Sequence, residues 1–131
     1  MMIRLDTHVW LWWLEGSDEI GLQIRTVIGR ADATIWVSAA TAWEITIKVA
    51  LGRLDLGEPP HVCLPRELKR SGFRPLPISL DHTLAVGRLP PLHRDPFDRL
   101  LVAQAQMNGL TIVTADPKIA KYDVPTLDPS R

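Results

Sequence analysis

The hydrophobic and polar positions follow two different spacings along the chain, and they predict strands and helices in alternation. Short runs of apolar and β-branched residues predict buried strands over 2–5, 34–37 and 110–116. Apolar residues at helical spacing predict helices over 6–16, 18–30, 39–52, 80–90 and 95–109. Asp6, Ser38 and Asp95 stand where N-caps are expected, and glycines follow several of the last turns.

Proline interrupts the pattern in the middle of the chain. The stretch 57–77 holds five of the eleven prolines, yet 65–72 inside it has the pattern of a short helix. A strand over 73–79 could lie only at a sheet edge, because proline cannot donate a backbone hydrogen bond to a neighbouring strand. A short segment over 117–122 and an extended tail over 124–127 complete the predicted elements.

The alternation of strands with helices is typical of βαβ units. We therefore expect an α/β fold in which a mainly parallel sheet is covered by helices on both faces. The 131 residues are enough for one domain with a sizeable core, so we expect a single domain over 1–131. Ligands of such sheets bind beyond the carboxyl ends of the strands, and candidate functional residues are sought there.

Composition narrows the class of protein. Hydrophobic residues make up 46% and charged residues 23%, as in globular proteins. Lys plus Arg equals Asp plus Glu, at 15 each, so the net charge favours no nucleic-acid partner. The lone Cys63 excludes an internal disulfide, and the apolar run 9–14 is far shorter than the roughly 20 residues that cross a bilayer. We therefore expect a soluble cytoplasmic protein with no membrane partner.

Four acids stand where the predicted fold would gather them. Asp6 follows one strand and Asp116 ends another, and Glu44 lies two turns into the helix that follows a third strand. Asp98 lies in the first turn of the helix that precedes the last strong strand. All four are therefore expected at one edge of one small sheet.

Each acid also has a purely structural explanation. The aspartates could cap helices, or they could be stabilised by the positive end of a helix dipole. Glu44 could form a capping box with Thr41 or pair with Lys48. A dimeric binding module whose acids merely cap helices is therefore one alternative. A phosphoacceptor domain is another, but such domains need a second acid close to the first, and His8 stands two residues after Asp6.

The joint arrangement of the acids indicates a metal site. Carboxylates within a few ångström of one another repel unless a cation neutralises them. Hard oxygen ligands suit Mg²⁺ or Mn²⁺, and the four histidines are too scattered for a zinc site. Such a site could activate water and stabilise the leaving oxygen of a phosphodiester. The chemistry implied is metal-dependent phosphodiester hydrolysis.

Four stretches resemble, in order and spacing, the PIN-domain ribonucleases: LDTHVWLWWL, VSAATAWEITIKVALGRL, HRDPFDRLLVAQA and IVTADP. The likeness is greatest to the VapC toxins of toxin–antitoxin pairs, and it extends over nearly the whole chain. The resemblance implies a PIN-like three-layer α/β/α sandwich and an endoribonuclease that hydrolyses RNA with Mg²⁺ or Mn²⁺. It also implies a homodimer that is neutralised by a cognate VapB-like antitoxin.

The resemblance assigns the site residue by residue. The four acids of the family, which bind the metal and carry catalysis, fall on Asp6, Glu44, Asp98 and Asp116. Asp98 is selected over Asp95 because the third acid of the family precedes a run like LLVAQA. The pattern leaves open whether Asp95 also reaches the metal through a water molecule. Thr114 matches a hydroxyl position beside the fourth acid and is expected to support the site by a hydrogen bond.

Other side chains near the acids extend the prediction. Arg94 and Arg99 flank the acidic helix start and are expected to contact RNA phosphates or an antitoxin tail. Arg99 could instead pair with Asp95, four residues before it. His93 is better placed than His8 to act near the site, but the sequence assigns a role to neither.

Overall fold

The five strands form one sheet in the order β3-β2-β1-β4-β5, and every neighbouring pair is parallel. The computed structural model describes all residues from 1 to 131. The strands are β1 (Met2–Leu5), β2 (Thr34–Ser38), β3 (Arg74–Leu76), β4 (Thr111–Val113) and β5 (Thr126–Leu127). The helices are α1 (Thr7–Glu15), α2 (Leu22–Ile28), α3 (Ala39–Ala50), α4 (Pro60–Ser71), α5 (Leu80–Val86), α6 (Pro96–Asn108) and the 3-10 helix η1 (Ile119–Lys121). None of the helices combines the length and apolar composition needed to span a bilayer.

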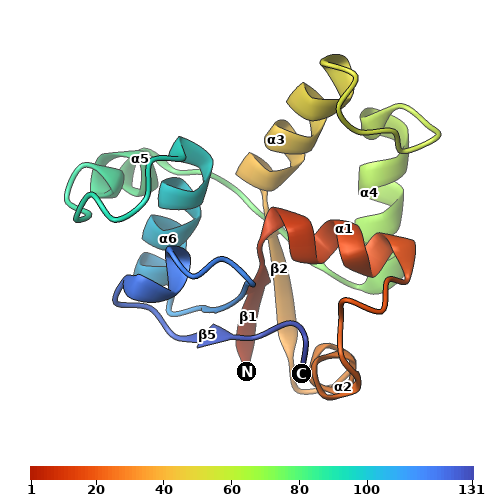
Figure 1. Cartoon of the computed structure of the whole chain (residues 1–131), viewed down its shortest axis with the longest axis horizontal. Helices are drawn as coiled ribbons and strands as arrows, with labels where there is room; N and C mark the ends of the chain where they lie inside the picture. The colour runs from red at the N-terminus through yellow and green to blue at the C-terminus, as the bar shows by residue number, and fades with distance from the viewer.

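Helices cover both faces of the sheet, as Figure 1 shows. α1, α2 and α4 lie on one side of β1 and β2, and α5 and α6 lie on the other. α3 continues from the end of β2 and contacts α1, α4 and α6. The predicted α/β fold, with helices on both faces of a parallel sheet, is therefore confirmed.

The side chains of β1 alternate between the two faces and divide the core in two. Ile3 and Leu5 enter a cluster of 14 buried residues that β1 and β2 share with α1, α2 and α4. Arg4 points to the opposite face, where its guanidinium meets α6. A smaller cluster of seven buried residues joins α6, β4 and η1 on that face. The face that carries Ile3 and Leu5 is thus mainly apolar, and the other carries a buried charge.

Two of the predicted helices begin elsewhere in the structure. The helix expected over 18–30 begins only at Leu22, because the chain at Gly21 packs against the C-terminal residues. A Cβ at Gly21 would lie 2.3 Å from backbone atoms of Ser130 and Arg131, so this contact requires glycine. Contacts of this kind join distant parts of the chain, and local helical spacing does not report them.

The helix expected over 65–72 is longer than predicted and begins at Pro60. Proline is favoured in the first turn, where its missing N–H has no helical partner to lose. Pro65 lies inside the helix, where it deprives only the carbonyl of His61 of a helical donor. His61 is exposed, so water can replace that donor. β3 lies at the edge of the sheet, as the prolines between 73 and 79 predict.

The topology places a crevice between the carboxyl ends of β1 and β4. From β1 the chain moves outward to β2 and β3, and it later returns to the other side of β1 to form β4 and β5. The connections after β1 and β4 therefore run to opposite faces and leave room for a ligand between them. Asp6 directly follows β1 and Thr114 directly follows β4.

Candidate active site

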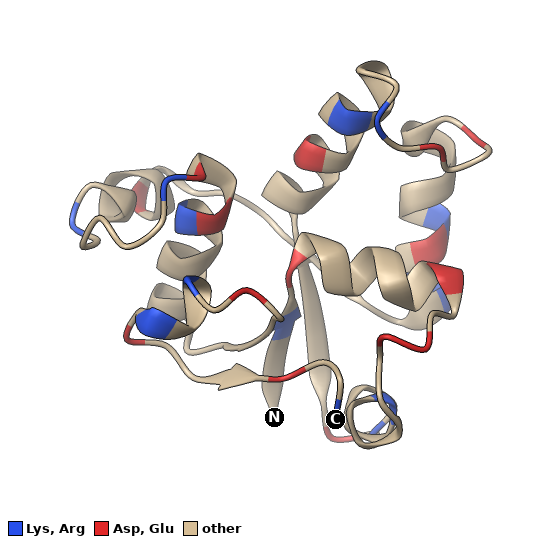
Figure 2. Cartoon of the chain, in the orientation of Figure 1, with Lys and Arg blue, Asp and Glu red and all other residues tan.

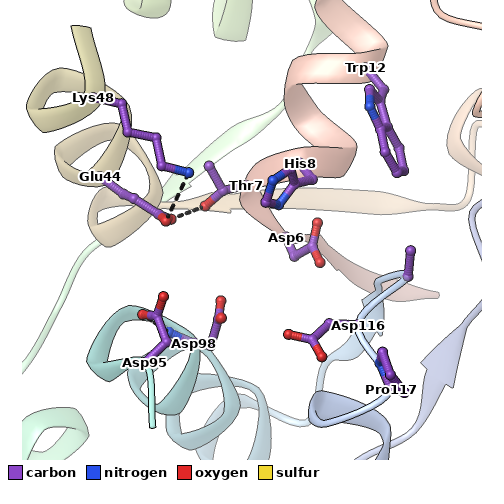
Figure 3. A pocket seen from close by; sticks show the side chains of 11 residues that line it. Asp6, Thr7, His8, Trp12, Glu44, Lys48, Asp95, Asp98, Asp116 and Pro117 are labelled. Carbon is purple, nitrogen blue, oxygen red and sulfur yellow. Dashed lines mark hydrogen bonds and ion pairs between the residues drawn. The ribbon is translucent and has the colours of Figure 1, made fainter. Parts of the chain in front are cut away.

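A pocket of about 450 Å³ opens beyond the carboxyl ends of the strands. It is lined by Asp6, Thr7, His8, Trp12, Glu44, Lys48, Asp95, Asp98, Ala115, Asp116 and Pro117. Figure 3 shows the five carboxylates turned toward a common space: they come from the N-caps of α1 and α6, from α3 and α6, and from the loop after β4. Lys48 is the one lysine or arginine in the lining. The structure therefore brings together all four acids that the sequence singles out.

Asp6 is held in place by both of its carboxylate oxygens. Oδ1 accepts the backbone N–H of Val9 at 2.9 Å, so Asp6 is the N-cap of α1, as predicted. Oδ2 accepts the hydroxyl of Thr114, which also accepts the backbone N–H of Asp116 at 3.0 Å. Burial raises the pKa of Asp6, although the hydrogen bonds from Thr114 and Val9 oppose that shift. Thr114 thus ties the first acid to the backbone of the fourth.

Glu44 is oriented by a hydroxyl and an ammonium group. The hydroxyl of Thr7 donates to Oε1 at 2.6 Å, and Lys48 Nζ lies 3.4 Å from Oε2. The capping box suggested for Thr41 and Glu44 does not form, because the N-cap of α3 is Ser38, as predicted from its position before the helix. Thr7 was missed by sequence reasoning, although a hydroxyl next to an acid that follows a strand was the available signal.

Asp95 and Asp98 have different environments despite lying three residues apart. Asp95 is the N-cap of α6, and its Oδ1 accepts the backbone N–H groups of Phe97 at 2.8 Å and Asp98 at 3.3 Å. Burial, followed by the negative charge of Asp95, raises the pKa of Asp98 to about 7, and His93 partly opposes this shift. Asp98 is therefore the acid whose ionised form most needs a neighbouring cation.

His93 lies between two of the acids. Its Nε2 is 2.7 Å from Asp116 Oδ2 and 3.0 Å from Asp98 Oδ2. Burial alone would raise the pKa of Asp116, but hydrogen bonds from His93 and from the backbone N–H of Lys118 outweigh it and leave that pKa lowered. The sequence placed His93 near the acids without a role, because its approach to Asp116 depends on how two loops pack.

A buried positive charge lies behind the acids. Arg4 has no exposed surface, and β1 carries a basic band in Figure 2. Its Nη1 donates to the carbonyl of Leu101 at 2.7 Å and to Gln104 Oε1 at 3.3 Å, while Nε and Nη2 have no hydrogen-bond partner. Burial lowers the pKa of Arg4 to about 9, and the charges of Asp6 and Asp98 oppose this shift. An arginine within a predicted buried strand was the sequence signal for this residue.

The two arginines that flank the acidic helix start differ in their surroundings. Arg94 is exposed. Arg99 does not form the alternative ion pair with Asp95. Its guanidinium donates to the hydroxyl of Tyr122 and to the backbone carbonyls of Val86, Leu89, Pro90 and His93. Arg99 therefore holds the connection between α5 and α6 against the rest of the protein.

The donor set of the pocket fits a hard divalent cation. Carboxylate oxygens line it, and two of the carboxyl groups, on Asp6 and Asp98, have pKa values raised by burial. Ionising such groups together leaves excess negative charge in a confined space, and a small divalent cation with oxygen preference relieves it. Asp98, Asp116 and His93 each offer one ligand atom within 4.8 Å of the others.

The protein is thus of the α/β class, with a parallel sheet whose carboxylate-lined pocket lies where the direction of strand order reverses, between β1 and β4. The PIN domain family model matches residues 3–125, and the chain belongs to the PIN domain family. Over 61 residues it is 36% identical to ribonuclease VapC16 of Mycobacterium tuberculosis. That match covers 47% of this chain and 43% of the relative, so it spans less than half the length of the relative.

Solved structures with the same fold come from toxin–antitoxin systems. VapBC2 from Rickettsia felis, bound to a promoter DNA fragment, contains a chain that superposes with a TM-score of 0.73 at 18% identity, over 97% of this chain and 98% of that one. A toxin–antitoxin complex from Klebsiella pneumoniae gives a TM-score of 0.64 at 17% identity, over 97% of each chain. At these identities the likeness establishes the three-layer PIN fold.

Proposed function

We propose that this protein is a metal-dependent endoribonuclease of the VapC kind, in which Asp6, Glu44, Asp98 and Asp116 hold Mg²⁺ or Mn²⁺. The observation that carries the proposal is the convergence of these four carboxylates in one pocket of about 450 Å³. The match to a ribonuclease from Mycobacterium tuberculosis supports RNA as the substrate. The domain over 1–131 would act as a single cytoplasmic unit.

The side chains of this pocket divide the work of phosphodiester hydrolysis. A divalent cation bound there supplies Lewis-acid chemistry, which activates water as nucleophile and neutralises charge on the phosphate. Asp6 and Glu44 are oriented for binding by Thr114 and Thr7, whose hydroxyls donate to them. Asp98 would bind the cation in its ionised form, because a nearby positive charge would lower the pKa of its carboxyl group.

The partners follow from the same likeness. Toxin–antitoxin complexes, VapBC2 among them, are structural relatives, which supports a VapB-like antitoxin as the partner. The acidic pocket is where that antitoxin would bind. The exposed Arg94 is suited to contact an RNA phosphate or an acidic segment of that antitoxin. A homodimer is supported by an apolar surface next to the pocket, where Trp43 is 59% exposed and its ring packs edge-on against Phe97, 5.1 Å between centroids.

The test compares two aspartates that lie three residues apart. Asp98→Asn should abolish Mn²⁺ binding, measured by titration calorimetry, together with RNA cleavage, because it removes a ligand charge. Asp95→Asn is the matched control and should keep most of both, because the asparagine oxygen can still accept the N–H groups of Phe97 and Asp98.

The outcome separates the proposed nuclease from a binding module whose acids only cap helices. Equal loss in both folded variants would show that the two aspartates have been given the wrong roles. Absence of Mn²⁺ binding by the unaltered protein would overturn the nuclease proposal itself.

A further inference from the structure

His93 is held beside the acidic pocket by contacts of its backbone N–H and its backbone carbonyl. The backbone N–H of His93 donates to the hydroxyl of Tyr122 at 2.9 Å. Its carbonyl accepts from Arg99 Nη1 at 3.4 Å, and the same guanidinium donates to the carbonyl of Val86 at the end of α5 and to those of Leu89 and Pro90 in the α5–α6 connection. The imidazole is thereby fixed against Asp98 and Asp116, two of the acids that line the pocket, and its side chain is only 10% exposed.

The hydrogen bonds of the ring assign its proton. Nδ1 accepts the backbone N–H of Asp95 at 3.1 Å, so Nδ1 of the neutral ring carries a lone pair and Nε2 carries the hydrogen. Nε2 in turn lies 2.7 Å from Asp116 Oδ2 and 3.0 Å from Asp98 Oδ2. The ring therefore presents a donor, and not a lone pair, to both acids.

This arrangement argues against His93 as a metal ligand. Ligation through Nε2 needs the other tautomer, which would place an N–H on Nδ1 directly against the N–H of Asp95. The helix cap at Asp95 and the tautomer of His93 are therefore linked through a single backbone hydrogen bond.

The same arrangement gives His93 a different task. Asp98 comes from α6 and Asp116 from the loop after β4, so these two acids belong to separate elements. Of the basic side chains, His93 alone lies within ion-pair distance of the Asp98 carboxylate, at 3.0 Å, while the neighbouring acids Asp95, Glu44 and Asp116 repel it. Because Nε2 bonds to Asp116 Oδ2 and also lies 3.0 Å from Asp98 Oδ2, one imidazole N–H is in place to hold the two carboxylates at a common spacing before any cation binds.

We infer that His93 is a positioning residue, which donates from Nε2 to Asp98 and Asp116 and sets the oxygen spacing at which this pocket accepts a hard cation. The inference rests on the proposed function, since it concerns the same site. It assigns to the histidine a task distinct from that of the four carboxylates.

The first experiment measures the affinity for Mn²⁺ by titration calorimetry. His93→Ala should weaken it by about 10-fold to 100-fold, the range typical when a group that orients metal ligands is lost. His93→Gln should recover most of the affinity, because its side-chain amide nitrogen can donate where Nε2 does. His61→Ala removes an exposed histidine of α4 and should leave the affinity unchanged. Thermal unfolding of the metal-free variants checks that each one folds.

The second experiment uses pulsed electron paramagnetic resonance on the Mn²⁺-loaded protein. No directly coordinated nitrogen should appear in the unaltered protein or in His93→Gln, and this comparison stands even if the alanine variant does not fold. A nitrogen coupling that disappears in His93→Gln would overturn the inference and make His93 a ligand. Unchanged or tighter Mn²⁺ binding by His93→Ala would overturn it too, because the histidine would then not position the metal-binding acids. If the unaltered protein binds no Mn²⁺, the proposed function fails and the inference fails with it.

Discussion

Ile3 and Arg4 are neighbours on β1, but they face two very different halves of the protein. Ile3 has no exposed surface and belongs to the cluster of 14 buried apolar residues. Arg4 is equally buried, yet it shares its face with a polar network. In that network Gln104 accepts from Ser38 Oγ at 2.6 Å and donates to the carbonyl of Pro77 at 3.2 Å.

The two faces of the sheet contribute differently: one mainly stabilises the fold, and the other mainly fixes the positions of side chains. Apolar burial on the first face supplies a free energy of folding that is roughly proportional to area and independent of direction. Hydrogen bonds and buried charge on the second face contribute less net stability, but they are directional and fix where side chains lie. The acids gather where the two halves meet, at the carboxyl end of β1.

The largest change in the free energy of unfolding is expected when an apolar side chain of the first face is shortened. Ile3→Ala should lower the free energy of unfolding by about 2–5 kcal/mol, because it leaves a cavity in a fully buried cluster. Denaturant titration measures this loss. Leu22→Ala, at a position that is 80% exposed, should change the free energy by less than about 0.5 kcal/mol. A loss below that value for Ile3→Ala would mean that this face does not carry the stability.

A smaller effect is expected from the ionisation of Asp98. Its pKa is raised to about 7, so between the unfolded value near 4 and pH 7 the folded state binds a proton that the unfolded state has released. Protonated Asp98 should therefore contribute most to the stability of the metal-free protein below pH 4 to 5. This contribution to the free energy of unfolding should be lost as the pH rises through 7. The loss should be on the order of 2 kcal/mol, less than the full pKa shift implies, because part of the carboxyl group reaches solvent.

Thermal or denaturant unfolding between pH 5 and pH 8 measures this dependence. Asp98→Asn should flatten it, and saturating Mn²⁺ should raise the stability of the unaltered protein most at pH 8, where Asp98 is ionised. An unaltered pH dependence in Asp98→Asn would assign the effect to another group.

The smallest effect on stability is expected from removing the buried charge. Arg4→Met should change the free energy of unfolding by no more than about 1 kcal/mol, because the cost of burying the guanidinium disappears together with its attraction to Asp6 and Asp98. Mn²⁺ binding at pH 8 should tighten by about threefold to tenfold, because a positive charge near the cation is removed. Calorimetry measures the change, and Arg88→Met, at an exposed position, is the control. A loss of several kcal/mol would show that Arg4 is needed for folding.

The sequence predicted those parts of the protein that depend on near neighbours in the chain. The N-caps at Asp6, Ser38 and Asp95 are confirmed, since each cap bonds to backbone groups two or three residues away. Prediction was weaker where distant segments meet. Gly21 packs against the C-terminal residues, and the pattern of residues 18–30 does not predict this contact. The start of α4 at Pro60 was missed because prolines usually indicate loops.

The candidate site divides in the same way. Hydrophobic spacing sets the order of strands and helices, and short-range hydrogen bonds set the starts of α1, α3 and α6 beside the acids. The sequence determines these features by itself. Only the tertiary structure decides that Arg4 lies behind the acids and that His93 reaches Asp116, 23 residues further along the chain. Such contacts depend on how the two faces of the sheet pack, and packing is a property of the whole fold.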